Sequence, residues 1–328
     1  MTNDFLHFSH FSDLRVVAVG GGTGLSTMLR GVKLYTQNIN VIVTVADDGG
    51  NSGMIREDLH ILPPGDIRNC LTALADTEPI MRDLFRYRFT SGRLEGYCFG
   101  NLFLAAMSEL SGSFEKAIEK MSSVLAVTGN VLPVTCDNVN LKAELENGTV
   151  VYGECSIPKC VLKNKSPIKK IMLSPQNVKV NDKCINAIYN ADLIVLGPGS
   201  LYTSIIPNLL VDGMKDALEN TNAKIVYVCN VMTQPGETDG FTAYSHIKAI
   251  ENHLGENIVD FCLANSQKVP DIFKKRYEMQ SAFPVIADDG EFTGTKTKLI
   301  QKDLLYFDGD VVRHDYIKLA ETLLSLPG

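Results

Sequence analysis

The 328-residue sequence predicts an α/β protein with a mostly parallel, doubly wound sheet and a small antiparallel hairpin region. Two observations lead to this prediction. Short apolar runs that end in glycine-rich loops alternate with segments of helical periodicity, which is typical of parallel β-α-β units. In the middle of the chain, Asn147-Gly148 separates two segments of alternating polarity, which is typical of a β-hairpin.

The first β-α-β unit begins with a strand over 16–19, which is apolar, β-branched and followed by glycines. A helix is expected over 25–34, with Thr23 or Ser26 as its N-cap, and a second strand over 41–46. A strand, a glycine turn, a helix and a further strand in this order predict a parallel, right-handed, Rossmann-like unit.

The rest of the chain continues this alternation. Helices are expected over 66–75, 100–110, 114–121, 181–190, 214–220, 242–254 and 315–326, and strands over 192–196, 223–228 and 258–263. The hairpin region is expected at about 131–173. Because no Pro/Ser-rich linker divides the chain, we expect an N-terminal extension over 1–14 and a single α/β domain over 15–328.

Composition narrows the function classes. The net charge is −7 and no dense run of Lys or Arg occurs, which argues against nucleic-acid binding. No apolar run is long enough for a membrane span, and residues 1–14 lack the basic and apolar regions of a secretory signal. The eight cysteines form no Cys-x-x-Cys pair, which favours free thiols in a reducing compartment. We therefore expect a cytoplasmic protein.

The loop after the first strand predicts a phosphate site. Glycines let backbone N–H groups approach a phosphate, and the following helix adds the positive end of its dipole. The expected ligand-binding residues are Gly21, Gly22, Thr23, Gly24 and Ser26. The alternative is a tight turn that needs glycine only for packing. The last glycine of a G-x-G-x-x-G fingerprint is missing, which argues against a dinucleotide-dependent oxidoreductase.

Asp47 and Asp48 follow the second strand, ahead of a polar, glycine-rich segment that contains Ser52. An acidic residue at this place accepts hydrogen bonds from a ribose or holds Mg²⁺ beside phosphates. The alternative is a turn that the two aspartates cap. Mg²⁺ is thus the cofactor considered, with Asp47 or Asp48 as its ligand, and all three polar residues are candidates for ligand binding.

Three further loops carry polar residues that suit a phosphate or a sugar. Arg68 offers a bidentate phosphate clamp, with a surface arginine as the alternative. The candidate ligand-binding residues of these loops are Asp66, Arg68 and Asn69; Gly199, Ser200 and Thr203; and Asn230, Thr233 and Gln234. The six histidines show no metal-ligand spacing and are interpreted as surface or structural. General acid–base chemistry therefore falls to Asp47, Asp48 or Asp66, if the protein is a catalyst.

These motifs, taken in order, resemble those of one family. They read Val-Gly-Gly-Gly-Thr-Gly-Leu-Ser (19–26), Thr-Val-Ala-Asp-Asp-Gly-Gly-Asn-Ser-Gly (44–53), Pro-Pro-Gly-Asp-Ile-Arg-Asn-Cys-Leu (63–71), Gly-Pro-Gly-Ser-Leu-Tyr-Thr-Ser (197–204), Pro-Asn-Leu-Leu-Val (207–211) and Met-Thr-Gln-Pro-Gly-Glu-Thr-Asp (232–239). They resemble the bacterial gluconeogenesis factors, which are related to the archaeal 2-phospho-L-lactate transferases. The resemblance covers the chain from about Arg15 to near its C-terminus.

The resemblance implies a UDP-sugar-binding regulator of cell shape and cell-wall precursor supply during growth on gluconeogenic carbon sources, with no reaction securely assigned. It implies that Tyr277 stacks on uracil, that Arg313 pairs with a diphosphate, and that Asn101 belongs to the ligand site. The expected partners are a UDP-sugar or related nucleotide diphosphate, proteins of cell-wall or cell-shape control, and further copies of this chain. The alternative function is a transferase that moves a phosphate-linked group from a nucleotide diphosphate donor.

The chain departs from the family pattern at a few places. Tyr97 stands where a histidine usually precedes Gly-Asn-Leu, Ser245 replaces an expected aspartate, and Asn51 stands where serine is common. If the missing histidine performs chemistry in the family, Tyr97 puts that chemistry in doubt for this chain. These departures favour binding over catalysis.

Overall fold

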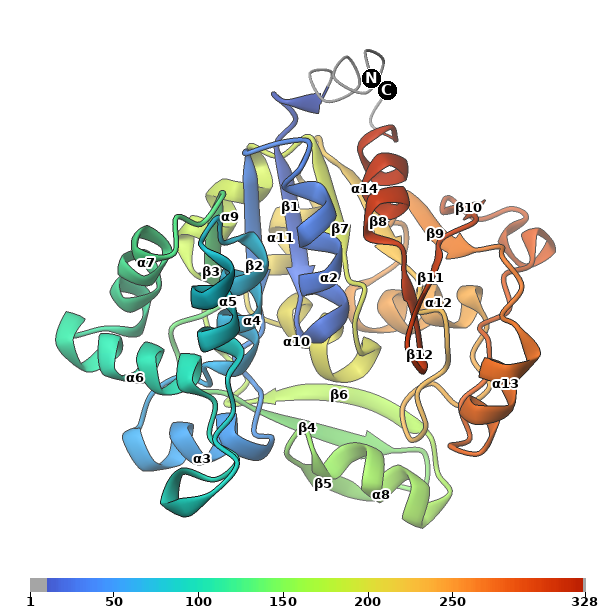
Figure 1. Cartoon of the computed structure of the whole chain (residues 1–328). Helices are drawn as coiled ribbons and strands as arrows, with labels where there is room; N and C mark the ends of the chain where they lie inside the picture. The colour runs from blue at the N-terminus through green and yellow to red at the C-terminus, as the bar shows by residue number, and fades with distance from the viewer. Residues whose placement is uncertain (1–10, 327–328) are drawn as a thin grey trace.

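The computed structural model describes residues 11–326, apart from the side chain of Asp308, so residues 1–10 of the expected extension lie outside it. Within this range, a seven-stranded sheet occupies the centre of the molecule (Figure 1), and each neighbouring pair of its strands is parallel. The strands lie in the order β10 (Lys298–Lys302), β9 (Phe261–Asn265), β8 (Lys224–Val228), β7 (Leu193–Leu196), β1 (Val16–Gly20), β2 (Ile39–Val43) and β3 (Asn130–Pro133).

Helices cover both faces of this sheet. Figure 1 shows α2, α4 and α14 in front of the strands and α9, α11 and α12 behind them. The bounds are α2 (Gly22–Val32), α3 (Gly50–Leu59), α4 (Gly65–Leu74), α5 (Pro79–Arg86), α6 (Phe99–Ser111), α7 (Phe114–Val124), α8 (Ser156–Asn164), α9 (Asp182–Tyr189), α10 (Ile206–Leu209), α11 (Met214–Glu219), α12 (Ala243–Leu254), α13 (Asp271–Glu278) and α14 (Tyr316–Leu324). The predicted doubly wound α/β class is confirmed. No helix of the described residues is long and apolar enough to cross a membrane.

The central strands are apolar because both of their faces are covered. All five residues of β1 and all four of β7 are buried. A parallel sheet with helices on both sides leaves no polar face, which explains continuous Val/Ile/Leu runs instead of alternation. The expected strand over 41–46 is shifted to Ile39–Val43, because Thr44 and the residues after it leave the ladder for the loop that carries Asp47.

A second, antiparallel sheet contains the predicted hairpin. Its strands lie in the order β5 (Val150–Tyr152), β4 (Asn140–Leu145) and β6 (Ile168–Ser174), with Asn147-Gly148 in the turn between β4 and β5. The excursion begins later than the expected residue 131, because Val131 pairs with β2 in the parallel sheet. In Figure 1 this sheet and α8 lie below the carboxyl ends of the parallel strands. A pair of short strands, β11 (Leu305–Asp308) and β12 (Val311–His314), precedes α14.

Several local expectations were wrong. The N-cap of α2 is Gly21, so neither Thr23 nor Ser26 caps this helix; the hydroxyl of Ser26 instead donates to the carbonyl of Thr23 at 3.0 Å. The segment after Asp48, considered as a turn, forms α3. Helices α5, α8, α10 and α13 were not expected. Most residues of α5 and α13 are exposed, so no buried apolar stripe marks these two helices in the sequence.

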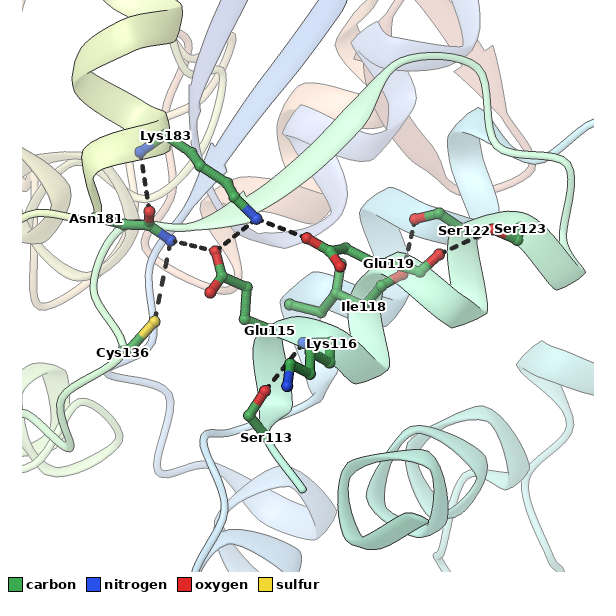
Figure 2. Close-up of polar contacts among 10 residues, drawn as sticks. All are labelled: Ser113, Glu115, Lys116, Ile118, Glu119, Ser122, Ser123, Cys136, Asn181 and Lys183. Atoms are coloured by element: carbon green, nitrogen blue, oxygen red, sulfur yellow. Dashed lines mark hydrogen bonds and ion pairs between the residues drawn. The ribbon is translucent and has the colours of Figure 1, made fainter. Parts of the chain in front are cut away.

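Polar contacts join α7 to the segment that begins α9, on one flank of the sheet (Figure 2). The Lys183 ammonium lies 2.6 Å from Glu119 and 3.1 Å from Glu115, both on α7. Asn181 caps α9 through its side-chain oxygen, which accepts from the Lys183 N–H, and its amide also donates to Glu115 at 3.1 Å. These contacts lie on the flank of α7 and α9, among residues that do not line the cavity described next.

Candidate functional site

The order of the parallel strands reverses between β1 and β7, and a cavity of about 450 Å³ opens where these two strands end. Loops on either side of such a switch point diverge, which leaves a crevice for ligands. The cavity is lined by Gly21–Gly24 and Thr27 after β1, Asp47 after β2, Asp66 of α4, Glu154 of the antiparallel sheet region, Pro198–Ser200 and Ser204 after β7, Asn230–Met232 and Gln234 after β8, Tyr277 of α13, and Val312–His314 of β12.

The first glycine loop packs tightly against the loop that follows β7. A Cβ on Gly24 would lie 2.8 Å from the Pro198 carbonyl oxygen, so only glycine allows this approach. Gly21, the N-cap of α2, has no side chain to satisfy the first N–H groups of the helix. The carboxylate of Asp66 accepts from the Gly22 N–H. The remaining N–H groups of this first turn, and the positive end of the helix dipole, meet the cavity.

The loop after β8 is hydrogen-bonded to the loop after β7. The side-chain amide of Gln234 donates to the Ser200 hydroxyl at 2.7 Å, and that of Asn230 donates to the Gly199 carbonyl at 2.8 Å. All four residues line the cavity. Because these hydrogen bonds join the two loops, the Ser200 hydroxyl and the Gly199 carbonyl have fixed directions before any ligand arrives.

A buried glutamate, Glu237, holds the turn that follows Ser200. After Ser200 the chain forms a π-helical turn, Leu201–Ile205, and Glu237 accepts hydrogen bonds there from the Tyr202 N–H and the Thr203 hydroxyl, both at 3.3 Å. Burial raises the pKa of Glu237 to about 7, although these hydrogen bonds act to lower it. Sequence reasoning missed Glu237, which lies beyond the cavity lining but fixes the segment after Ser200.

Three carboxyl groups face the floor of the cavity, from Asp47, Asp66 and Glu154. Burial, followed by the negative charge of Asp47, raises the pKa of Asp66 to about 6. Burial, followed by the charges of Asp47 and Asp66, raises the pKa of Glu154 to about 9. Like charges held together in this way disfavour full ionisation unless a cation compensates them. This part of the cavity therefore suits a cation or a hydrogen-bond-donating ligand group.

The donor set fits Mg²⁺ in one specific way. Among the described residues, no group of three His, Cys, Asp or Glu side chains is arranged to hold a metal ion. Mg²⁺, however, is commonly bound by one or two carboxylates together with waters and ligand phosphates. Asp47 lines the cavity, whereas the Asp48 carboxylate accepts from the Cys155 N–H at 2.9 Å and lies outside the lining. Of the two aspartates, Asp47 is thus the one placed to meet a cation beside a phosphate.

Tyr277 and Arg313 line one wall of the cavity and are joined through one residue. The Tyr277 hydroxyl accepts from the Val312 N–H at 3.1 Å, which fixes the ring of α13 against β12. Arg313 is the next residue of β12 and, like Tyr277, faces the cavity. An aromatic ring and a guanidinium therefore share this wall of the cavity.

The structure brings together twelve of the expected site residues and leaves eight outside the lining. The residues outside are Ser26, Asp48, Ser52, Arg68, Asn69, Asn101, Thr203 and Thr233. Ser26 and Asn69 bond residues that line the cavity. Ser52 accepts from the Gly65 N–H at 2.8 Å at the start of α4, and Asn69 hydrogen-bonds to Asp66. Arg68 is buried and donates to Asn101 at 3.1 Å, so its guanidinium serves a buried network behind the loop.

Sequence reasoning missed several lining residues. Glu154 follows a glycine with a positive φ of 91° at the end of the hairpin, and this turn was the one available signal. His314 lines the cavity and is buried, as is His246 elsewhere, so these two are structural rather than surface histidines. The other missed residues are Thr27, Pro198, Ser204, Val231, Met232 and Val312.

The parallel sheet and the cavity at its switch point define the class: a doubly wound α/β protein with a polar cavity at the strand ends. Within this class, the chain belongs to the 2-phospho-L-lactate transferase CofD family, which it matches over residues 16–305.

Proteins named gluconeogenesis factor are similar to nearly the whole chain. The Bacillus subtilis protein is 48% identical over 313 residues, which is 95% of this chain and 98% of that protein. The Halalkalibacterium halodurans protein is 46% identical over 311 residues, which is 94% of this chain and 95% of that protein. A crystal structure of a UPF0052 family member from Bacillus halodurans superimposes with a TM-score of 0.92 at 45% identity, covering 95% of this chain and 100% of that one. The resemblance to the gluconeogenesis factors is confirmed.

Proposed function

We propose that this protein is a cytoplasmic regulator that binds a UDP-sugar of the UDP-N-acetylglucosamine type. In this proposal it serves cell morphogenesis and cell-wall precursor supply under gluconeogenic growth. Occupancy of the cavity shifts a loop or an oligomer equilibrium, and protein partners in cell-wall or cell-shape control respond to that shift. Its relatives named gluconeogenesis factor support the physiological setting.

The observation that carries the proposal is the pairing of two kinds of wall in one cavity. Glycine loops and helix N–H groups, which suit a diphosphate, line this cavity. Tyr277 and Arg313 line it as well. A nucleotide sugar needs both kinds of surface, because its base stacks on an aromatic ring while its phosphates need N–H groups and a guanidinium.

Each residue then has a distinct task. The N–H groups of Thr23 and Gly24 and the Arg313 guanidinium hold the diphosphate, and Tyr277 stacks on the uracil. Ser200 and Asn230, already oriented by Gln234 and Gly199, hydrogen-bond to the sugar hydroxyls. Mg²⁺, when bound at Asp47, neutralises phosphate charge.

Calorimetric titration of the full chain with UDP-N-acetylglucosamine, with and without Mg²⁺, tests the proposal. We expect saturable binding, weakened at least tenfold in Arg313→Ala and Tyr277→Ala, which corresponds to about 1.4 kcal/mol or more. The matched controls are Arg93→Ala and Tyr189→Ala, because both side chains are exposed and lie outside the cavity. If no UDP-sugar binds, or if the controls weaken binding equally, the proposal is wrong. GDP and NAD in the same series test the competing ligand classes.

A transferase is the second candidate, and the cluster of Asp47, Asp66 and Glu154 favours it. Carboxyl groups beside a diphosphate site can hold Mg²⁺ or take a proton from an acceptor alcohol. The 2-phospho-L-lactate transferase CofD family to which the chain belongs supports this reading. Incubation with guanosine- or uridine-diphosphate donors and acceptor alcohols tests it. Product that disappears in Asp47→Asn but persists in Asp48→Asn is expected of a transferase, and an unchanged mixture after long incubation contradicts it.

A further inference from the structure

Four arginines from three elements gather beside the cavity. Arg30 lies on α2, one helical turn beyond the cavity residue Thr27, while Arg82 and Arg86 lie on α5. Arg313 lies on β12. Figure 1 shows α5 to one side of α2, and β12 with α14 to the other. The charges of Arg86, Arg82 and Arg313 all act on Arg30, so the four side chains share one region of the surface.

Three of these four arginines form no ion pair among the described residues. Within residues 11–326, Arg30, Arg82 and Arg86 take part in none of the observed ion pairs, whereas Arg15 and Arg276 each bond an aspartate. Burial, followed by the charges of Arg86, Arg82 and Arg313, lowers the pKa of Arg30, and the phenol of Tyr316 opposes this. A guanidinium nevertheless remains protonated in proteins, so the repulsion persists. Asp83 acts to raise the pKa of Arg86, but burial and then the charge of Arg82 lower it by more.

Arg30 is also incompletely hydrogen-bonded. Its Nε atom is buried and has no hydrogen-bond partner among the described residues. A buried donor without a partner is costly, and a cation surrounded by like charges adds to that cost. A protein keeps such an arrangement where a ligand supplies the missing acceptors. An anion with several oxygens satisfies both needs, because the planar guanidinium binds phosphate in a bidentate manner.

We propose that Arg30, Arg82 and Arg86 form a second anion site, beside the cavity, which binds a phosphorylated small molecule. The partly buried position of Arg30 between helices favours a compact ligand over an extended acidic chain. This site is distinct from the cavity site in which Arg313 is proposed to hold a diphosphate. It does not depend on the identity of the nucleotide in the cavity. A protein with two such neighbouring sites can sense one phosphorylated compound while holding another.

Titration of the full chain with inorganic pyrophosphate tests the proposal. We expect the dissociation constant to rise at least tenfold in Arg30→Gln and in the double variant Arg82→Gln/Arg86→Gln, and to stay within twofold in Arg93→Gln, an exposed arginine elsewhere. The double variant changes only exposed side chains, which keeps the test valid if Arg30→Gln folds poorly. Unliganded variants should melt no lower than the parent, since a purely structural role would lower their melting temperature.

Two comparisons separate this site from the cavity. Pyrophosphate binding should persist in Arg313→Ala and in the presence of saturating UDP-N-acetylglucosamine. Binding that depends on Arg313 but not on Arg30, Arg82 or Arg86 would overturn the second site, and so would full displacement by the nucleotide sugar. If no UDP-sugar binds at all, while pyrophosphate binding still requires Arg30, the second site stands and the proposed nucleotide-sugar function fails.

Discussion

Gly24 lies so close to Pro198 that an added Cβ would be 2.8 Å from the Pro198 carbonyl oxygen. Gly24 lies in the first turn of α2, directly after β1, and Pro198 lies in the loop after β7; β1 and β7 are the two strands at the switch point of the sheet. Their contact sets the distance between two segments that line the cavity. The geometry of the site thus depends on the absence of one side chain.

We expect Gly24→Ala to lower the free energy of unfolding by about 1–3 kcal/mol, because the methyl group meets backbone that cannot move aside without strain. It should also weaken UDP-N-acetylglucosamine binding at least tenfold by separating the two loops. Urea unfolding and calorimetry measure both effects. Gly290→Ala is the matched control, since the nearest atom there belongs to the flexible Asp288 side chain. A Gly24→Ala protein with unchanged stability and affinity would contradict the described packing.

Glu237 predicts a specific dependence of stability on pH. Its pKa is about 7 in the folded protein and 4.5 in the unfolded chain, so the folded state binds more protons between these values. The unfolding free energy attributable to this group therefore falls as pH rises from about 4.5, and the loss, up to about 3 kcal/mol, is complete above pH 7.

Glu237→Gln should remove this component, because the amide stays neutral and still accepts from the Tyr202 N–H or the Thr203 hydroxyl. The measurement is urea unfolding of parent and variant at pH 5 and pH 8. The other titrating groups are common to both proteins, so the difference between the two pH trends isolates Glu237. Parallel trends would show that this carboxyl group does not titrate between those pH values.

We expect Asp47 to lower the stability of the unliganded protein while it contributes to ligand binding. Its charge raises the pKa of both Asp66 and Glu154, which means that it repels their ionised forms. Asp47→Asn removes this repulsion and keeps the oxygen that accepts from the Gly49 N–H at 2.8 Å. We expect the unliganded variant to gain about 0.5–2 kcal/mol.

In the presence of Mg²⁺, nucleotide diphosphates should raise the melting temperature of the parent but not that of Asp47→Asn. Thermal unfolding with and without Mg²⁺ and ligand measures both effects. Asp58→Asn is the control, because Asp58 is an exposed aspartate of α3 that lies outside the cavity. If Asp47→Asn instead melts lower than the parent without ligand, the three carboxyl groups do not repel one another.

Local patterns sufficed to predict the parallel sheet and the glycine loops. Short apolar strands followed by glycine place loops such as Gly21–Gly24 and Pro198–Ser200 at one edge, whatever the details of packing. The Asn-Gly turn predicted its hairpin equally well. Tyr277 and Arg313 were singled out by resemblance alone, since nothing near them in sequence distinguishes a cavity wall from a surface.

The residues that sequence reasoning missed or misplaced depend on long-range packing. Glu154 reaches the cavity because the antiparallel sheet lies across the carboxyl edge of the parallel one, which no local pattern encodes. Arg68 was expected to meet phosphate, yet it is buried against Asn101, because α4 is covered on more sides than its apolar stripe indicated. Glu237 serves a turn that precedes it by more than thirty residues.

Loss of the contacts in Figure 2 should change the unfolding free energy only slightly and should not affect the cavity. Lys183 is half exposed, and exposed ion pairs contribute about 0.2–1 kcal/mol each. Lys183 pairs with both Glu115 and Glu119, so Lys183→Met should lower the unfolding free energy by no more than about 2 kcal/mol and leave ligand affinity unchanged. Asn181→Ala should cost about 1 kcal/mol or more, because it removes the N-cap of α9 as well as the bond to Glu115. Urea unfolding of both single variants and of the double variant measures the coupling between Lys183 and Asn181. A loss above about 2 kcal/mol in Lys183→Met would show that its two ion pairs are stronger than their exposure implies.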